Sequence, residues 1–262
     1  MTPEAVVLRE QHRLVAGGLG DARRVLEVGC GHGALAAMLA GEGREVTAVD
    51  LMLPVERPSP AVRWIEGHFV ALSDADFGDA FDAVAFTTSL HHIAALDDAL
   101  ARAESLLRPG GRLVLDEFDL AAPDAACARW YYDVQELLAA AGAYPADRID
   151  DGADAEPRAR WLAAHEHHGE PPLHPGASMI TAVEARFDGT RVERGPYLYR
   201  YICGGLDGPH AGALAETVLA LERRRITSGL LPAVGLALTA ARRWSAALSC
   251  GVHRTSFGAG QL

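Results

Sequence analysis

The stretch Arg24-Val25-Leu26-Glu27-Val28-Gly29-Cys30-Gly31-His32-Gly33-Ala34-Leu35 joins an apolar run to a helix-forming segment through alternating glycines. This pattern predicts a buried strand, a tight turn and a helix that starts near Gly33. Glycines at such a junction allow positive φ and a close approach to a ligand, while the first amides of a helix attract negative charge. The turn therefore favours a carboxylate or a phosphate, and the spacing Gly29, Gly31, Ala34 also fits the dinucleotide fingerprint G-x-G-x-x-G/A.

Strand and helix patterns alternate on both sides of this stretch. Further strands are predicted at 45–50, 62–66, 81–86 and 112–116, and helices at 3–16, 33–39 and 96–107. This alternation predicts a parallel sheet with right-handed crossovers. Prolines 54, 58 and 60 predict a loop in place of the second crossover helix.

Asp50 closes the second strand, 17 residues beyond Gly33. A carboxylate at the end of that strand lies beside the glycine turn and can accept hydrogen bonds from two vicinal ribose hydroxyls. The alternative is that Asp50 only caps a helix.

Helical patterns dominate the chain after residue 118. Helices predicted at 126–141 and 157–165 indicate an inserted cap over 119–178. A helix at 178–187, a strand-like stretch at 190–203 that Gly195-Pro196 interrupts, a helix at 211–225 and a strand at 231–240 would then complete a seven-stranded sheet in 179–245, followed by a flexible tail in 246–262. Tyr197, Tyr199 and Tyr201 alternate along the first of these strands and should share one face.

Composition and charge narrow the function classes. The 262 residues carry a formal net charge of -11, which argues against a nucleic-acid partner. The four cysteines lie far apart, so neither a zinc ribbon nor a disulfide scaffold is expected, and free thiols fit the cytoplasm. We expect no signal peptide, no membrane segment and no metal site, and the sequence does not indicate an oligomeric state.

Four motifs in order resemble those of class I S-adenosylmethionine-dependent methyltransferases, small-molecule branch. They are 25–33, 46–50, 81–84 with Leu90-His91-His92-Ile93, and 106–113, and the resemblance covers about residues 22–118. It implies a doubly wound, mostly parallel seven-stranded α/β sheet of Rossmann-like methyltransferase type, here with the inserted helical cap.

The resemblance also implies which residues hold S-adenosylmethionine. Its amino-acid end would lie on Glu27, Gly29, Cys30 and Gly31, its ribose on Asp50, its adenine on Leu51, His68 and Phe69, and its methionine portion against Thr87. His68 stands where the family commonly has an acid. Independently of the resemblance, a carboxylate at position 27 suits a ligand with an ammonium group better than a diphosphate, which favours this cofactor over a nicotinamide dinucleotide.

Four histidines are candidates for a general base, because histidine transfers protons near neutral pH. His91 and His92 follow the fourth strand, and His168 and His174 lie in the expected cap. Each of them can equally have a structural or solvated role. The predicted function is methyl transfer to a small-molecule acceptor, with oxygen slightly preferred over nitrogen or carbon. The alternatives are a protein that binds the cofactor without transferring methyl, and a nicotinamide-dependent reductase.

Overall fold

The computed structural model describes residues 1–149, 156–164 and 173–244. It has one seven-stranded sheet in the order β3-β2-β1-β4-β5-β7-β6. Strands β1 to β5 are parallel, while β7 runs antiparallel to both β5 and β6. The expected α/β class, with a doubly wound, mostly parallel seven-stranded sheet, is therefore confirmed.

The elements follow one another in the order that the alternating patterns predict for the first half of the chain. The strands are β1 (Arg24–Val28), β2 (Glu45–Asp50), β3 (Arg63–Glu66), β4 (Phe81–Thr87), β5 (Leu107–Phe118), β6 (Asp188–Gly195) and β7 (Gly235–Ala241). The α-helices are α1 (Pro3–Leu19), α2 (Ala34–Gly41), α3 (Asp74–Phe77), α4 (Leu96–Leu106), α5 (Ala125–Ala140), α6 (Pro157–Ala164), α7 (Gly176–Arg186), α8 (Leu198–Cys203) and α9 (Ala211–Thr227). Short 3₁₀ turns are η1 (Leu90–His92) and η2 (Ala146–Arg148).

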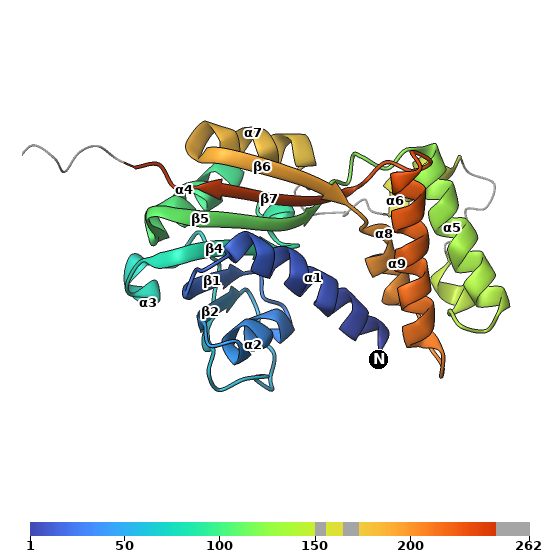
Figure 1. Cartoon of the computed structure of the whole chain (residues 1–262), viewed down its shortest axis with the longest axis horizontal. Coiled ribbons are helices and arrows are strands. Elements are labelled where there is room, and N and C mark those ends of the chain that lie inside the picture. Colours follow the sequence, from blue (N-terminus) through green and yellow to red (C-terminus); the bar gives the residue numbers. More distant parts are fainter. Residues whose placement is uncertain (150–155, 165–172, 245–262) are drawn as a thin grey trace, which may run out of the picture.

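Helices cover both faces of the sheet because its strands are apolar on both sides, as in a parallel sheet. On one face, α1 and α2 bury side chains such as Val15 and Leu39 against β1, β2 and β4. On the other face, α4 and α7 bury Leu100 and Met179 against β4, β5 and β7. In Figure 1, α7 lies next to β6 at the top of the view, and α1 and α2 lie in its lower half with β1 and β2.

The chain between β2 and β3 contains no helix, as its prolines predict. This loop closes against the glycine turn instead. The Trp64 Nε1 donates a hydrogen bond to the Ser59 carbonyl at 3.1 Å, and a Cβ on Gly33 would lie 2.3 Å from the Trp64 ring. Gly33 (φ 73°) thus allows the indole to pack directly on the start of α2.

A second group of helices lies at one end of the sheet, to the right in Figure 1. We call α5, α6, α8 and α9 the helical cap. They share one apolar core with the start of α1, in which Trp161 is fully buried and the rings of Phe118 and Tyr197 stack at 4.7 Å. Two of these helices, α8 and α9, come from the chain between β6 and β7, and so lie beyond the expected cap of 119–178. The domain boundaries predicted from sequence stay a prediction.

The strand predicted at 190–203 is correct only in its first part. β6 ends at Gly195, and the predicted shared strand face of Tyr197, Tyr199 and Tyr201 is wrong, because these residues begin and form α8. The reason is a distant carboxylate: Glu222 of α9 accepts the backbone N–H groups of Tyr197, Leu198 and Tyr199 at 2.8, 3.0 and 2.8 Å. These are the amides that a helix start leaves without partners.

Three expectations fall wholly or partly on residues outside the described ranges. They are the tail 246–262, the end of the helix predicted at 157–165, and the candidate His168. Within the described ranges, no helix is long and apolar enough to cross a membrane.

Candidate functional site

Two cavities adjoin at the carboxyl edge of the sheet, where β1, β2 and β4 end. Cavity A, of about 350 Å³, lies between the glycine turn, α1 and α8. Cavity B, of about 390 Å³, lies between the ends of β1, β2, β3 and β4. Gly29, Gly31 and Thr88 line both cavities, so the two form one elongated site folded over the turn.

A buried carboxyl group lies at the wall of cavity A. Glu27 is 1% exposed, and its Oε1 accepts a hydrogen bond from the Thr87 hydroxyl at 3.0 Å. Its Oε2 is buried and has no hydrogen-bond partner of good geometry in the part of the chain that the structure describes. Burial raises the pKa of Glu27 to about 8, and the charge of Asp50 acts in the same direction, while the Thr87 hydroxyl and, more weakly, the Ala36 amide oppose it. A cation that enters cavity A would favour the charged carboxylate and satisfy Oε2.

The glycine turn brings backbone groups to the same cavity. Gly29 (φ 76°) and Gly31 (φ 51°) lie in the left-handed region, and a Cβ on Gly29 would come within 2.1 Å of the Ser89 Cβ. Gly33 offers no capping side chain to α2, whose first residues Ala34 and Leu35 line cavity A. The first amides of an uncapped helix bind anions, so cavity A offers an anion site beside a carboxyl group that suits a cation.

Asp50 lies at the corresponding place in cavity B. Its Oδ2 accepts the Gly31 N–H at 2.7 Å, and its Oδ1 accepts the Met52 N–H at 3.3 Å. These bonds fix the carboxylate at the end of β2, where its remaining lone pairs can accept hydroxyl hydrogens from a ligand in cavity B.

All nine residues that the resemblance assigns to the cofactor line at least one of the two cavities. Those of cavity A are Glu27, Gly29, Cys30, Gly31 and Thr87, and those of cavity B are Gly29, Gly31, Asp50, Leu51, His68 and Phe69. Their contacts with a cofactor stay a prediction.

The candidate bases differ in their positions. His91 is buried and lines neither cavity, because its Nδ1 lies 2.5 Å from an Oε2 of Glu117. The other oxygen of Glu117 accepts the N–H groups of Ser89 and Leu90 at 2.9 and 2.7 Å. This carboxylate therefore holds the turn after β4 in place.

Of the other three candidate bases, one lines a cavity. His92 lines cavity B. His174 lines neither cavity: its backbone N–H donates to the His91 carbonyl, and its ring Nε2 lies 3.0 Å from the Ile93 carbonyl oxygen. His168 lies outside the described residues. Of the candidates that the structure describes, His92 is the one with access to a ligand.

Sequence reasoning missed several residues at the site. Thr88 is the one non-glycine residue with positive φ (53°) in the described ranges, and no sequence signal marks it, because threonine is rarely found there. Val7, Leu8 and Gln11 of α1 form a wall of cavity A. For these α1 residues the sequence did give a signal. Val6 to Leu8 are three successive apolar residues, which cannot all lie on one face of a helix, so at least one of them must point away from the sheet.

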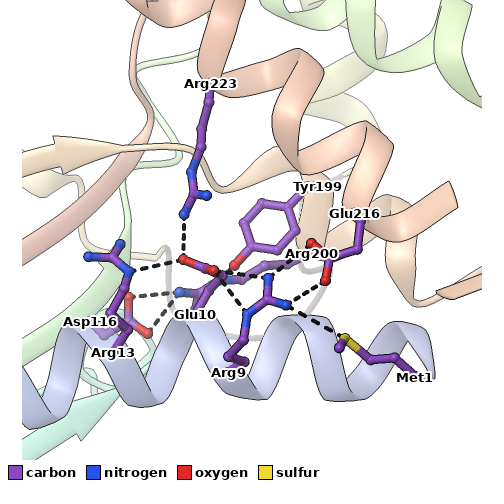
Figure 2. Close-up of polar contacts among 9 residues, drawn as sticks. All are labelled: Met1, Arg9, Glu10, Arg13, Asp116, Tyr199, Arg200, Glu216 and Arg223. Atoms are coloured by element: carbon purple, nitrogen blue, oxygen red, sulfur yellow. Dashed lines mark hydrogen bonds and ion pairs between the residues drawn. The ribbon is translucent and has the colours of Figure 1, made fainter. Parts of the chain in front are cut away.

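Arg200 of α8 was also missed, and it too lines cavity A. Its Nη2 lies 2.9 Å from each carboxylate oxygen of Asp116, at the end of β5. Figure 2 shows this pair beside a second charged group, in which Arg9, Arg13 and Arg223 surround Glu10 and Arg9 also contacts Glu216. These contacts join α1 to α9, and so join one wall of cavity A to the helical cap.

Comparison with known proteins gives relatives that agree with this geometry. An uncharacterized methyltransferase of Mycobacterium bovis is 40% identical over 100 residues, which cover 36% of this chain and 50% of the relative. A ubiquinone biosynthesis O-methyltransferase of Xylella fastidiosa is 41% identical over 100 residues, 34% of this chain and 39% of the relative. The chain thus spans half or less of the length of these curated relatives.

A solved structure and a family model cover more of the chain. The 1,6-didemethyltoxoflavin-N1-methyltransferase of Burkholderia thailandensis, solved with S-adenosylhomocysteine, has a TM-score of 0.52 at 22% identity, over 92% of this chain and 80% of that chain. This likeness shows the fold. The family model described as a methyltransferase domain matches residues 5–174, which is more than half of the chain. The protein therefore belongs to the methyltransferase domain family, of the class I S-adenosylmethionine-dependent type.

Proposed function

We propose that this protein transfers the methyl group of S-adenosylmethionine to a small-molecule acceptor. The observation that carries the proposal is that cavity A contains both a carboxyl group that suits a cation and helix amides that suit an anion. The buried Oε2 of Glu27 has no hydrogen-bond partner of good geometry among the described residues, and the uncapped start of α2 lies in the same cavity. An ammonium and a carboxylate on one carbon would satisfy both groups, and an amino-acid end of this kind is what the cofactor carries.

The neighbouring cavity fits the rest of the same molecule. Asp50 is held at the end of β2 in cavity B, and Phe69 and Ile93 give that cavity apolar surface for the adenine ring. The cofactor would then cross the turn at Gly29 and Gly31, which line both cavities. Side chains at these two positions would narrow that crossing.

When bound, the cofactor supplies a sulfonium that already activates the methyl group for displacement. The protein's own task is then to align the acceptor and to exclude water. Thr87 at the end of β4, Thr88 directly after it, and Val7 and Leu8 from α1 provide mostly apolar walls for this in cavity A. We assign no general base to the acceptor, because His92 lines cavity B, where the adenosine portion of the cofactor would lie, and not cavity A. His91 and His174 instead hold the turn after β4.

The acceptor atom is proposed to be oxygen. The support is the Xylella fastidiosa relative, named a ubiquinone biosynthesis O-methyltransferase, which matches 34% of this chain. The net charge of -11 supports a small molecule over a nucleic acid, because clustered basic residues supply nucleic-acid affinity.

Calorimetry with S-adenosylhomocysteine tests the first half of the proposal. We expect binding by the wild-type chain and none of NADH, and absence of S-adenosylhomocysteine binding would refute the proposal. Incubation with methyl-labelled cofactor and a small-molecule cell extract tests the second half. Label transferred to an extract component supports methyl transfer, whereas tight cofactor binding without any transfer would favour a protein that only binds it.

A further inference from the structure

Arg200 is held in one orientation at the wall of cavity A. Its Nη2 lies 2.9 Å from both oxygens of Asp116, its Nε lies 3.4 Å from the Tyr199 hydroxyl, and its guanidinium carbon lies 4.6 Å from the centre of the Tyr197 ring. The side chain is 8% exposed. Three separate contacts therefore fix a desolvated cation at this place.

One end of this guanidinium is unused. The guanidinium is paired with Asp116 through Nη2, and its Nη1 donates no hydrogen bond to residues 1–149, 156–164 and 173–244. Nη1 is not fully buried, so water can reach it, and a ligand that displaces this water must supply an acceptor in its place. Since Arg200 lines cavity A, a ligand in that cavity can supply the missing oxygen.

We propose that Arg200 is a specificity-determining residue that binds a carboxylate of the methyl acceptor, so that the acceptor is a small organic acid. This inference rests on the proposed function. Carboxylates form the stronger, charge-assisted hydrogen bonds with arginine, which a neutral amide or alcohol oxygen does not match. The apolar remainder of the acid would lie against Val7, Leu8 and Cys203, which line the same cavity.

The cofactor also carries a carboxylate, which Arg200 could bind in place of the acceptor's. Two features favour the acceptor. The uncapped start of α2 already provides amides for the cofactor's carboxylate, on the side of the cavity formed by the glycine turn. Arg200 comes instead from α8 in the helical cap. The experiment below separates the two sources.

The first measurement is the affinity of the full chain for S-adenosylhomocysteine, in wild type and in Arg200→Met. The second titrates the S-adenosylhomocysteine-loaded proteins with benzoate, phenylacetate and succinate, and with the corresponding amides. For wild type we expect at least one acid to bind about tenfold or more tightly than its amide, and for Arg200→Met we expect this preference to vanish with little change in S-adenosylhomocysteine affinity.

Asp116→Asn distinguishes an acid-binding role from a structural one. It leaves the charge of Arg200 uncompensated, so the affinity for the acids should rise or stay equal, whereas loss of Arg200 lowers it. A residue that only braces α8 against β5 would give weaker binding in both variants. The double variant Asp116→Asn/Arg200→Met removes both buried charges and should lose the preference while keeping the thermal midpoint closer to wild type.

Arg194→Met is the matched control. Arg194 also pairs with an aspartate, Asp119 at 2.7 Å, but it does not line cavity A. This variant should keep the preference for acids. The inference is overturned if wild type binds no acid better than its amide, or if Arg200→Met keeps the preference or weakens S-adenosylhomocysteine binding instead. If wild type fails to bind S-adenosylhomocysteine at all, the proposed function fails first.

Discussion

The carboxyl edge of the sheet and the helical cap both border cavity A, but they do so with different kinds of group. The edge contributes backbone: Gly29, Gly31 and Thr88 all have positive φ, and the edge's one buried carboxyl group there is Glu27. The cap contributes a single charged side chain, Arg200, positioned by aromatic rings and by Asp116. A site made from backbone depends on a few residues at fixed spacing, whereas a site made from packed side chains depends on residues far apart in the chain.

The largest effect should come from changing the backbone side of this comparison. In Gly29→Ala the new Cβ would lie 2.1 Å from the Ser89 Cβ at a φ of 76°, so both overpacking and left-handed strain act. We expect a loss of about 3 kcal/mol of unfolding free energy from these two effects, and no measurable S-adenosylhomocysteine binding. Urea unfolding and calorimetry measure the two quantities.

Gly31→Ala is the control for this prediction. A Cβ at Gly31 has no neighbour within 4 Å, although φ is 51°. Only the strain of about 1–2 kcal/mol should reduce stability, while cofactor affinity still falls because Gly31 lines both cavities. Equal stability of the two variants would show that the approach of Ser89 to the turn does not matter.

A pair of buried glutamates allows each region to be disturbed separately. Glu117 accepts amides of the turn after β4, and Glu222 accepts amides at the start of α8. In either Glu→Gln variant an amide N–H₂ replaces an accepting oxygen, which should cost about 1–3 kcal/mol. We expect Glu117→Gln to weaken S-adenosylhomocysteine binding and Glu222→Gln to leave it unchanged while weakening acid binding in cavity A.

Thermal unfolding and the two titrations described for Arg200 measure these effects. If Glu222→Gln weakened S-adenosylhomocysteine binding as much as Glu117→Gln, the two regions would act as one unit and the comparison would not hold.

Much of the edge could be predicted from sequence, because its function restricts the residues directly. Positive φ favours glycine, as at Gly29 and Gly31 after β1, and the end of β2 carries Asp50, so the pattern is local and ordered along the chain. The fold followed from the same alternation of strands and helices. Glu27 could be recognised as a site residue because a carboxyl group within an apolar strand is costly to bury unless it has a partner.

The cap could be predicted only as helical. The alternation Tyr197-x-Tyr199-x-Tyr201 is typical of a strand, yet the carboxylate of Glu222 turns the segment into a helix. Nothing near the tyrosines in sequence marks that partner. Arg200 escaped prediction for the same reason, since its meaning depends on Asp116, which lies 84 residues earlier. The histidines illustrate the opposite error, in which a residue is proposed as catalytic from its type alone. His91 was a candidate base because it is a histidine, but its ring contacts the buried Glu117 and lines neither cavity.

Glu27 should show a conflict between stability and binding. Its pKa is raised from 4.5 to about 8 in the folded chain, so between these values the folded state holds the proton more tightly than the unfolded state. Stability therefore falls as pH rises from about 4.5 to 8 and changes no further above that. Glu27→Gln removes this loss, so its thermal midpoint should exceed that of wild type at pH 8 and not at pH 5.

The same variant should bind S-adenosylhomocysteine about tenfold to a hundredfold more weakly at pH 8, because a charge-assisted hydrogen bond to the ammonium is lost. Differential scanning fluorimetry across pH and calorimetry at pH 8 give both results. A Glu27→Gln protein that is less stable than wild type at pH 8 would contradict the assignment of burial as the dominant influence on this carboxyl group.

The smallest effect concerns the contact that joins the two regions. Arg9 of α1 forms a paired contact with Glu216 of α9, with Nη2 and Oε2 3.0 Å apart, and the two side chains are 41% and 40% exposed. An ion pair so exposed contributes up to about 1 kcal/mol and is screened by salt. The single variants Arg9→Gln and Glu216→Gln and their combination form a double-mutant cycle that isolates this term from the Arg9–Glu10 contact.

We expect a coupling of about 0.5 kcal/mol at low salt that nearly disappears in 1 M NaCl, measured by urea unfolding. Burial acts to raise the pKa of the adjacent Glu10, but Arg13, Arg223 and Arg9 together lower it, so most of the attachment of α1 should remain in the double variant. Acid binding in cavity A should then change little, since Val7 and Leu8 stay in place. A coupling well above 1 kcal/mol that resists salt would instead make Arg9 and Glu216 the main link between edge and cap.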